Sequence, residues 1–192
     1  MKGVDSSSTI HSSSATSVYP GRYTAQIEGP FVVFLLGMRV NKFWQFGKWV
    51  LVFRSMNQML RTLYTDSSTG FLGARVGFTG KGPVLVQYWR SFAELEAFAK
   101  APSHFHRPAW ERYNKEIAKS GTAGIWHEAY EVRAGAYECI YTNMPRVGLA
   151  KAGEHVAAHN LGHSAAKRIG RSETDEPAVD PTWAEDLSGG TG

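Results

Sequence analysis

Two histidines in the middle of the chain have the chemistry of a general base. His127 stands between Trp126 and Glu128 in a stretch otherwise suited to burial, and His106 follows a phenylalanine. An imidazole changes its charge near neutral pH, so it could take a proton from a substrate or ligate a haem iron. The alternative for both is a structural histidine that bonds to a neighbouring strand or caps a helix. Both are candidate catalytic residues and candidate cofactor ligands.

Polar and aromatic side chains near these histidines suit a flat apolar ligand. Tyr88 and Arg90 could orient an oxyanion, because a phenol and a guanidinium both donate hydrogen bonds. Large rings are concentrated on few segments, as a pocket for such a ligand requires, although they would equally fill a core. The candidate substrate-binding rings are Trp49, Phe53, Trp89, Trp110, Trp126 and Tyr130.

Several other chemistries are disfavoured. Cys139 is the single cysteine and has no cationic neighbour in sequence, so neither a disulfide within the chain nor a thiolate nucleophile is expected. The chain has no glycine-rich phosphate loop. His155, His159 and His163 are spaced by four residues, but glycines interrupt the segment, and we interpret them as tail histidines. No metal site is predicted.

Length and composition predict one domain between two polar arms. The chain has 192 residues, of which 43% are hydrophobic. Residues 1–19 contain seven serines and are expected to be a disordered arm, and residues 151–192 a mostly disordered tail, which leaves 20–150 as the folded unit. The net charge is +4 with scattered basic residues, so no nucleic-acid partner is expected.

The chain also lacks signals for a membrane or for secretion. Its longest apolar run, residues 31–36, is far shorter than the roughly 20 residues that cross a bilayer. The first residues lead into serines with no apolar stretch. We therefore expect a cytoplasmic protein with no membrane partner.

Apolar periodicity predicts the elements that must position the candidate residues. Residues 49–63 have helical spacing, Gly80 and Gly82 separate two β-like runs, and Ser91 with Glu94 forms a capping box. A second helical segment follows Pro108, and residues 137–142 could add a short strand. The predicted fold class is α+β, a ferredoxin-like βαββαβ antiparallel sheet with two helices on one face, with strands at 31–40, 71–79, 84–90 and 124–132.

The first strand of this fold predicts a partner. Residues 31–36 are all apolar, so both faces of the strand should be buried, yet the two helices cover only one. The other face would be covered most simply by the same face of a second subunit. We therefore expect a homodimer.

Five short segments resemble the monooxygenase-like proteins of unknown function within the dimeric α+β barrel superfamily. They are residues 20–24 (PGRYT), 40–44 (VNKFW), 87–91 (QYWRS), 106–110 (HRPAW) and 124–128 (GIWHE). The resemblance implies the dimeric α+β barrel fold and a monooxygenase-like oxidoreductase acting on a hydrophobic or aromatic small molecule. Relatives in that superfamily include cofactor-free monooxygenases, haem-degrading monooxygenases, haem aldoxime dehydratases and binding modules.

These relatives leave two alternatives open. One is a haem enzyme, an oxygenase or an aldoxime-dehydratase-like lyase, with His127 or His106 as axial ligand and Arg39, Arg75 or Arg90 binding the propionates. The other is a non-catalytic small-molecule-binding dimer.

The resemblance also bears on the aromatic residues 43–53, which are interleaved with lysines and could lie on a membrane surface. Because the family places this helix against the sheet, we favour core and cavity lining for them.

Overall fold

The computed structural model describes residues 17–101, 115, 118–158, 165 and 169. His106, Trp110, the helical segment predicted after Pro108 and most of both predicted arms lie outside the described residues.

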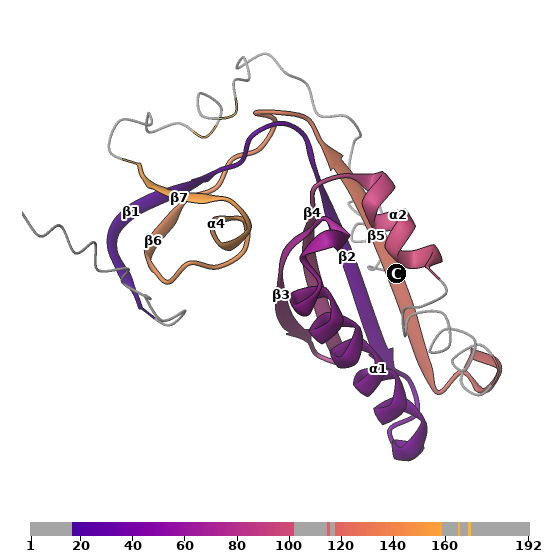
Figure 1. Cartoon of the computed structure of the whole chain (residues 1–192). Coiled ribbons are helices and arrows are strands. Elements are labelled where there is room, and N and C mark those ends of the chain that lie inside the picture. The colour runs from indigo at the N-terminus through magenta and orange to yellow at the C-terminus, as the bar shows by residue number, and fades with distance from the viewer. Residues whose placement is uncertain (1–16, 102–114, 116–117, 159–164, 166–168, 170–192) are drawn as a thin grey trace, which may run out of the picture.

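The main body is a four-stranded antiparallel sheet in the order β3-β4-β2-β5 (Figure 1). The central strand β2 pairs with β4 on one side and with β5 on the other. This order and the alternation with helices confirm the predicted ferredoxin-like βαββαβ fold. The strands are β2 (Phe31–Val40), β3 (Phe71–Thr79), β4 (Gly82–Trp89) and β5 (Ala123–Val132).

Two helices, α1 (Phe46–Thr65) and α2 (Phe92–Lys100), cover one face of this sheet (Figure 1). Two short 3₁₀ turns, η1 (Ser67–Thr69) and η2 (Ala118–Ser120), accompany them. Val52 and Met56 of α1 pack against Met38 of β2, while Met59 and Leu63 pack around Val32 together with Leu95 and Phe98 of α2. The predicted helical spacing is therefore the spacing of the buried residues.

Alternation along β2 divides its side chains between the two faces. Val32, Met38 and the other even-numbered residues face the helices, and the odd-numbered residues, beginning with Phe31, face the opposite side. Residues directly opposite one another in paired strands share a face, so the strand pairing shows on which face of the sheet each side chain lies. We call the two sides the helix face and the far face.

A second sheet, which the sequence analysis did not predict, lies beyond the far face (Figure 1). It has the order β6-β1-β7, with β1 (Tyr19–Gln26), β6 (Tyr141–Met144), β7 (Glu154–Ala157) and the single turn α4 (Leu149–Ala152). Phe31 is buried against Ala25, Leu149 and Ala150 of this lobe. One end of the far face is thus covered by the chain itself and not by a second subunit as expected. The ordered chain also extends past residue 150, into β7.

The capping box at the start of α2 gives a test of the fold. Ser91 Oγ accepts a hydrogen bond from the Glu94 amide at 3.2 Å and donates one to the Glu94 carboxylate at 3.0 Å. Replacing Ser91 by alanine should lower the free energy of unfolding by about 1 kcal/mol, because a helix-start amide loses its partner. Urea denaturation measures the change.

The matched control for this prediction is Ser55→Ala. The Ser55 hydroxyl bonds to the Leu51 carbonyl within α1, at 2.9 Å, and caps nothing. Alanine is the better helix former, so this variant should change the stability by less than about 0.5 kcal/mol. Equal losses in the two variants would show that the cap contributes nothing of its own.

Candidate functional site

His127 lies on the helix face of β5. It is paired with Leu36 of β2, and its ring lies 5.6 Å from the ring of Phe34, centroid to centroid. The side chain is exposed, so its nitrogens can reach a ligand. Glu128 points to the far face and accepts a hydrogen bond from the Tyr130 hydroxyl at 2.6 Å. As the strand alternation predicted, Glu128 does not orient the imidazole.

The surroundings of His127 on the helix face are apolar. Leu36 and Ile125, which flank it, pack against the cluster that contains Val52 and Met56. Trp49 and Phe53 of α1 are partly buried against the same cluster. An imidazole beside such a surface can accept a proton from a flat apolar molecule that packs there.

Trp89 occupies the core. Its side chain has no exposed surface, its Nε1 donates to Gln87 Oε1 at 3.0 Å, and its ring packs between those of Phe71 and Phe98. A fully enclosed ring of this kind stabilises the packing of α2 on the sheet. It presents no surface to a ligand.

Trp126 and Tyr130 lie on the far face of β5, with 40% and 51% of their surfaces exposed. The indole of Trp126 rests directly on the backbone of Gly37, where a Cβ atom would fall 2.1 Å from indole Cε2. The absent side chain of Gly37 therefore makes room for the indole. Within the described part of the chain, which lacks Trp110, the predicted substrate-binding rings do not converge on one pocket, because they are divided between the core and the two faces.

Arg90 follows β4 and is exposed. Its guanidinium forms a salt bridge and hydrogen bonds with Glu94 of α2, and this contact lowers the pKa of the Glu94 carboxyl and raises that of Arg90. Trp89, which precedes Arg90, is paired with Val32 of β2, whereas His127 is paired with Leu36. These two positions of β2 are four residues apart. At the rise of a strand this places Arg90 roughly 13 Å or more along the sheet from His127.

Tyr88 lies on the far face, where the second lobe covers it, and joins a cluster with Tyr141 and Cys139. An added Cβ at Gly148 would lie 3.3 Å from the Tyr88 hydroxyl and 3.6 Å from the Tyr141 hydroxyl, so both hydroxyls lie beside Gly148 at the start of α4. The Ala150 amide donates to the Tyr141 hydroxyl at 3.3 Å, and the Leu149 backbone bonds to the Tyr88 hydroxyl. Sequence reasoning selected Tyr88 and missed Tyr141.

Burial raises the pKa of both phenols. Desolvation is the largest cause for each, and the neighbouring Cys139 adds to it; the pKa of Tyr141 reaches about 12. Both hydroxyls are consequently protonated at neutral pH, so they accept bonds from backbone amides while keeping a proton to donate.

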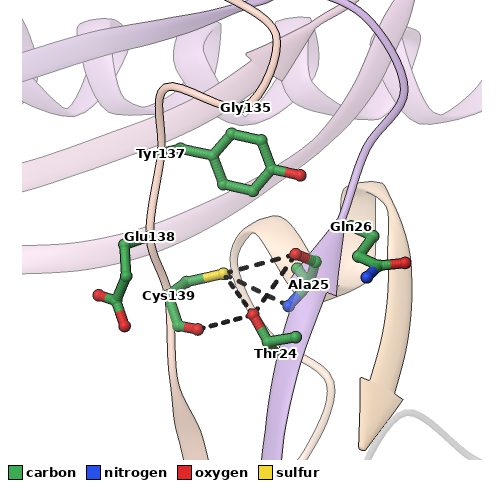
Figure 2. Close-up of a pocket in the computed structure, with 7 residues that line it drawn as sticks. All are labelled: Thr24, Ala25, Gln26, Gly135, Tyr137, Glu138 and Cys139. Atoms are coloured by element: carbon green, nitrogen blue, oxygen red, sulfur yellow. Dashed lines mark hydrogen bonds between the residues drawn. The ribbon is translucent and has the colours of Figure 1, made fainter. Parts of the chain in front are cut away.

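Figure 2 shows a small pocket where the chain leading to β6 passes β1. Cys139 Sγ accepts a hydrogen bond from the Ala25 amide at 3.3 Å, and Thr24 Oγ1 donates to the Cys139 carbonyl at 2.8 Å. Tyr137 accepts a bond from the Ile27 amide at 2.9 Å. The cavity measures about 160 Å³, which is small beside the roughly 300 Å³ of common ligand pockets. These contacts attach the segment to β1.

His155 belongs to β7 and so is an element of the second sheet, where the sequence analysis had expected a tail. Its ring stacks on Tyr23 at 4.5 Å and meets the edge of Tyr19 at 4.8 Å. Burial, and then the positive charge of Arg146, lower its pKa, so the neutral form is favoured. His159 and His163 lie outside the described residues. Within the described part, no three histidine, cysteine or acidic side chains gather as metal ligands would.

None of the described helices is both long enough and apolar enough to cross a bilayer.

Comparison with known proteins connects this arrangement to one family. A family model described as monooxygenase af470-like matches residues 31–149, which contain the whole four-stranded sheet and both helices. No curated protein matches the chain.

Solved structures of low sequence identity share the fold. An aldoxime dehydratase crystallised with butyraldoxime superposes with a TM-score of 0.56 at 15% identity, over 80% of this chain and 44% of the dehydratase. The chain thus spans less than half the length of that enzyme. A dimeric ferredoxin-like protein of unknown function from Bacteroides fragilis gives 0.39 at 15% identity, over 53% and 95% of the two chains. A possible oxidoreductase from Bacteroides thetaiotaomicron gives 0.38 at 10%, over 55% and 99%.

The pKa of Tyr141 predicts how stability depends on alkaline pH. An unfolded tyrosine titrates near pH 10, whereas folded Tyr141 titrates near 12, so the folded protein holds this proton more tightly. The stabilisation is complete below about pH 10 and is lost as the pH rises through about 12. We expect the free energy of unfolding to fall over this interval, and Tyr141→Phe to reduce the fall.

Absorbance of tyrosinate, with urea denaturation at each pH, measures both quantities, and the urea-denatured chain is the reference. A Tyr141→Phe protein whose stability declines as steeply as the wild type between pH 10 and 12 would contradict the assignment.

Proposed function

The chain belongs to the monooxygenase af470-like family, and from this premise we propose that it is a monooxygenase-like oxidoreductase acting on a hydrophobic or aromatic small molecule. The family match is the observation that carries the proposal. The exposed imidazole of His127 on the apolar helix face supports it from the structure. His127 is the proposed catalytic base.

In the proposed reaction the substrate supplies its own reducing power. His127 takes a proton from an acidic hydroxyl or carbon of the substrate, and a carbon atom of the resulting anion forms a bond to O2. The imidazolium returns the proton to give a hydroperoxide, whose O–O bond breaks as water is lost, so that one oxygen atom stays on the substrate as a carbonyl and the other leaves as water. Until the proton is returned, the protonated imidazole stays beside the anion and stabilises it. Phe34, Ile125 and Phe53 offer the apolar surface that packs against the substrate and excludes water. His106 and Trp110 remain proposed members of this site from their sequence alone.

Two predicted residues are left out of the site. Tyr88 lies on the far face under the second lobe, and Arg90 is paired with Glu94 at the end of β4. Neither shares the surface of His127. The oxyanion partner in this proposal is therefore the imidazolium itself.

The haem alternative was tested against the arrangement of the candidate ligands. His127 is exposed beside Phe34, as an axial ligand could be. The arginines expected to bind the haem propionates do not lie on the same face as His127 or are already paired. Arg39 and Arg75 are paired with residues of the far face, and Arg90 binds Glu94. The described residues do not fit haem as one site.

We also propose that the uncovered part of the far face joins a second copy of the chain. Leu35, Val84 and Val86 are half-buried there, next to exposed Trp126 and Tyr130. Exposed apolar side chains favour association, although the charged Glu128 and Arg75 lie among them as the partners of Leu35 and Val86. A two-fold contact would place like strands face to face. The dimeric description of the Bacteroides fragilis protein is consistent with this.

Oxygen consumption tests the catalytic proposal. With a panel of aromatic hydroxy compounds that includes an anthrone, the wild-type protein should consume oxygen with at least one of them. His127→Gln should lower the rate by roughly a hundredfold or more, because the ring nitrogen that takes the proton is gone. Glu128→Gln, its neighbour on the opposite face, should leave the rate unchanged.

Two results would replace this proposal. Saturable binding of a panel compound without turnover, retained in His127→Gln, would indicate the non-catalytic binding module. Hemin that gives a Soret band with the wild type and none with His127→Ala would restore the haem alternative. Unchanged oxygen consumption in His127→Gln would reject His127 as the base.

The dimer has its own test. Val86→Glu places a charge on the uncovered far face and should convert the protein to a monomer in sedimentation equilibrium at micromolar concentration. Val76→Glu is the matched control, because Val76 is paired with Leu85 on the helix face and is exposed. A wild-type protein that already sediments as a monomer would contradict the dimer.

A further inference from the structure

Four aromatic side chains at one end of the molecule are largely exposed to solvent. Their exposed fractions are 56% for Phe43, 78% for Trp44, 62% for Phe46 and 76% for Phe78. The sequence analysis favoured core or cavity lining for residues 43–53. That interpretation fits the partly buried Trp49 and Phe53 and is wrong for Phe43, Trp44 and Phe46. We call these four exposed rings the tip patch.

The tip patch lies where β2 ends and α1 begins. The Val40 amide bonds to the carbonyl of Lys81 in the β3–β4 turn at 2.8 Å, and the Asn41 amide bonds to Thr122 before β5 at 2.9 Å. Trp49 Nε1 donates to the Phe43 carbonyl at 3.2 Å, which holds the loop against α1. Phe78 precedes the same β3–β4 turn. In Figure 1 the start of α1 is far from the lobe of β1, β6 and β7.

Basic residues surround the tip patch, and acidic residues are absent from its segments. Arg39, Lys48, Lys81 and Lys119 are exposed. No acidic residue occurs in the sequence between Glu28 and Asp66. Within the described part of the chain, none of these four cations forms a salt bridge. Their charges are therefore available to an external anionic partner.

We propose that the tip patch binds the surface of an anionic lipid bilayer. Tryptophan and phenylalanine rings are stabilised at the interface between headgroups and acyl chains, and each nearby lysine adds about 1 kcal/mol of attraction to anionic lipid. The rings enter the interface while Lys48 and Lys81 remain among the headgroups. The binding is peripheral, since no described helix can span the bilayer. It does not depend on the proposed oxidoreductase activity.

Charge favours a lipid surface over a second copy of this chain. A two-fold contact through the tip patch would bring Lys48 and Lys81 of one copy against those of the other. Residues 29–65 and 67–93, which carry the four rings and these lysines, contain no acidic residue to neutralise them. An anionic bilayer supplies the missing negative charge across the whole surface.

Sedimentation with lipid vesicles tests the proposal. The full chain is mixed with vesicles of phosphatidylcholine, with or without one-third phosphatidylglycerol. We expect it to sediment with the anionic vesicles, to bind the neutral ones more weakly, and to dissociate as salt is added. The double variant Trp44→Ser, Phe46→Ser should reduce the partition coefficient by roughly tenfold or more, and Lys48→Glu or Lys81→Glu by at least about fivefold each.

Matched controls are available elsewhere on the surface. Phe92→Ser removes an exposed ring at the start of α2, and Arg61→Glu reverses an exposed charge near the other end of α1. Both should bind anionic vesicles as the wild type does. The thermal unfolding transition of every variant establishes that it is folded.

Three results would overturn the proposal. The wild type could fail to bind anionic vesicles, or it could bind them equally well with the tip patch removed. The double variant could also lower the oligomeric state in sedimentation equilibrium, in which case the tip patch is an interface between copies of the chain.

Discussion

The central strand β2 has to be covered on both faces, and the arrangement of the remaining elements follows from this requirement. Its even-numbered residues are covered by α1 and α2, which supply the two main apolar clusters. Its odd-numbered residues begin with Phe31, which is enclosed by the second lobe, and continue with Val33 and Leu35, which are only half-buried. The second sheet covers one end of the far face of β2, and the rest of that face is left uncovered by the described part of the chain as far as Arg39, the one charged residue of the strand.

The elements that could be predicted from sequence are those with a local signal. The helix spacing of residues 49–63, the glycines of the β3–β4 turn and the Ser91 cap each act within a few residues of the chain. The second sheet has little such signal: the short strand expected at 137–142 overlaps only the first two residues of β6. Tyr19 pairs with Met144 and Tyr23 with Ala157, across most of the chain, and β6 and β7 have only four residues each. A strand this short shows no periodicity, and β1 contains Pro20 and Gly21, which are rare inside strands.

For the candidate site, strand alternation predicted which residues of one strand share a face, but not which elements pack on that face. Consecutive residues of a strand point to opposite faces of the sheet. Trp126 and His127 therefore cannot line the same pocket, and neither can Tyr88 and Trp89. Which face each would join depends on where α1 and α2 pack, and the sequence analysis had grouped all four into one site. Tyr141 and His155 were beyond reach, because only pairing with β1 brings them beside Tyr88 and Tyr23.

The two faces of the sheet consequently differ in the chemistry they can support. On the far face, Tyr88 and Tyr141 lie beside α4 as protonated phenols. Their hydroxyls accept hydrogen bonds from backbone amides of α4, and these bonds hold the second lobe to the sheet. An ionised phenol there would lose solvation, and for Tyr88 the positive charge of Arg75 offsets only part of that cost, so the pKa stays raised. On the helix face, His127 is exposed beside Phe34 and bears no such structural bond within the described residues. A group that must exchange a proton with a substrate needs that freedom, and for this reason we propose His127 on the helix face, and not the phenols of the far face, as the catalytic base.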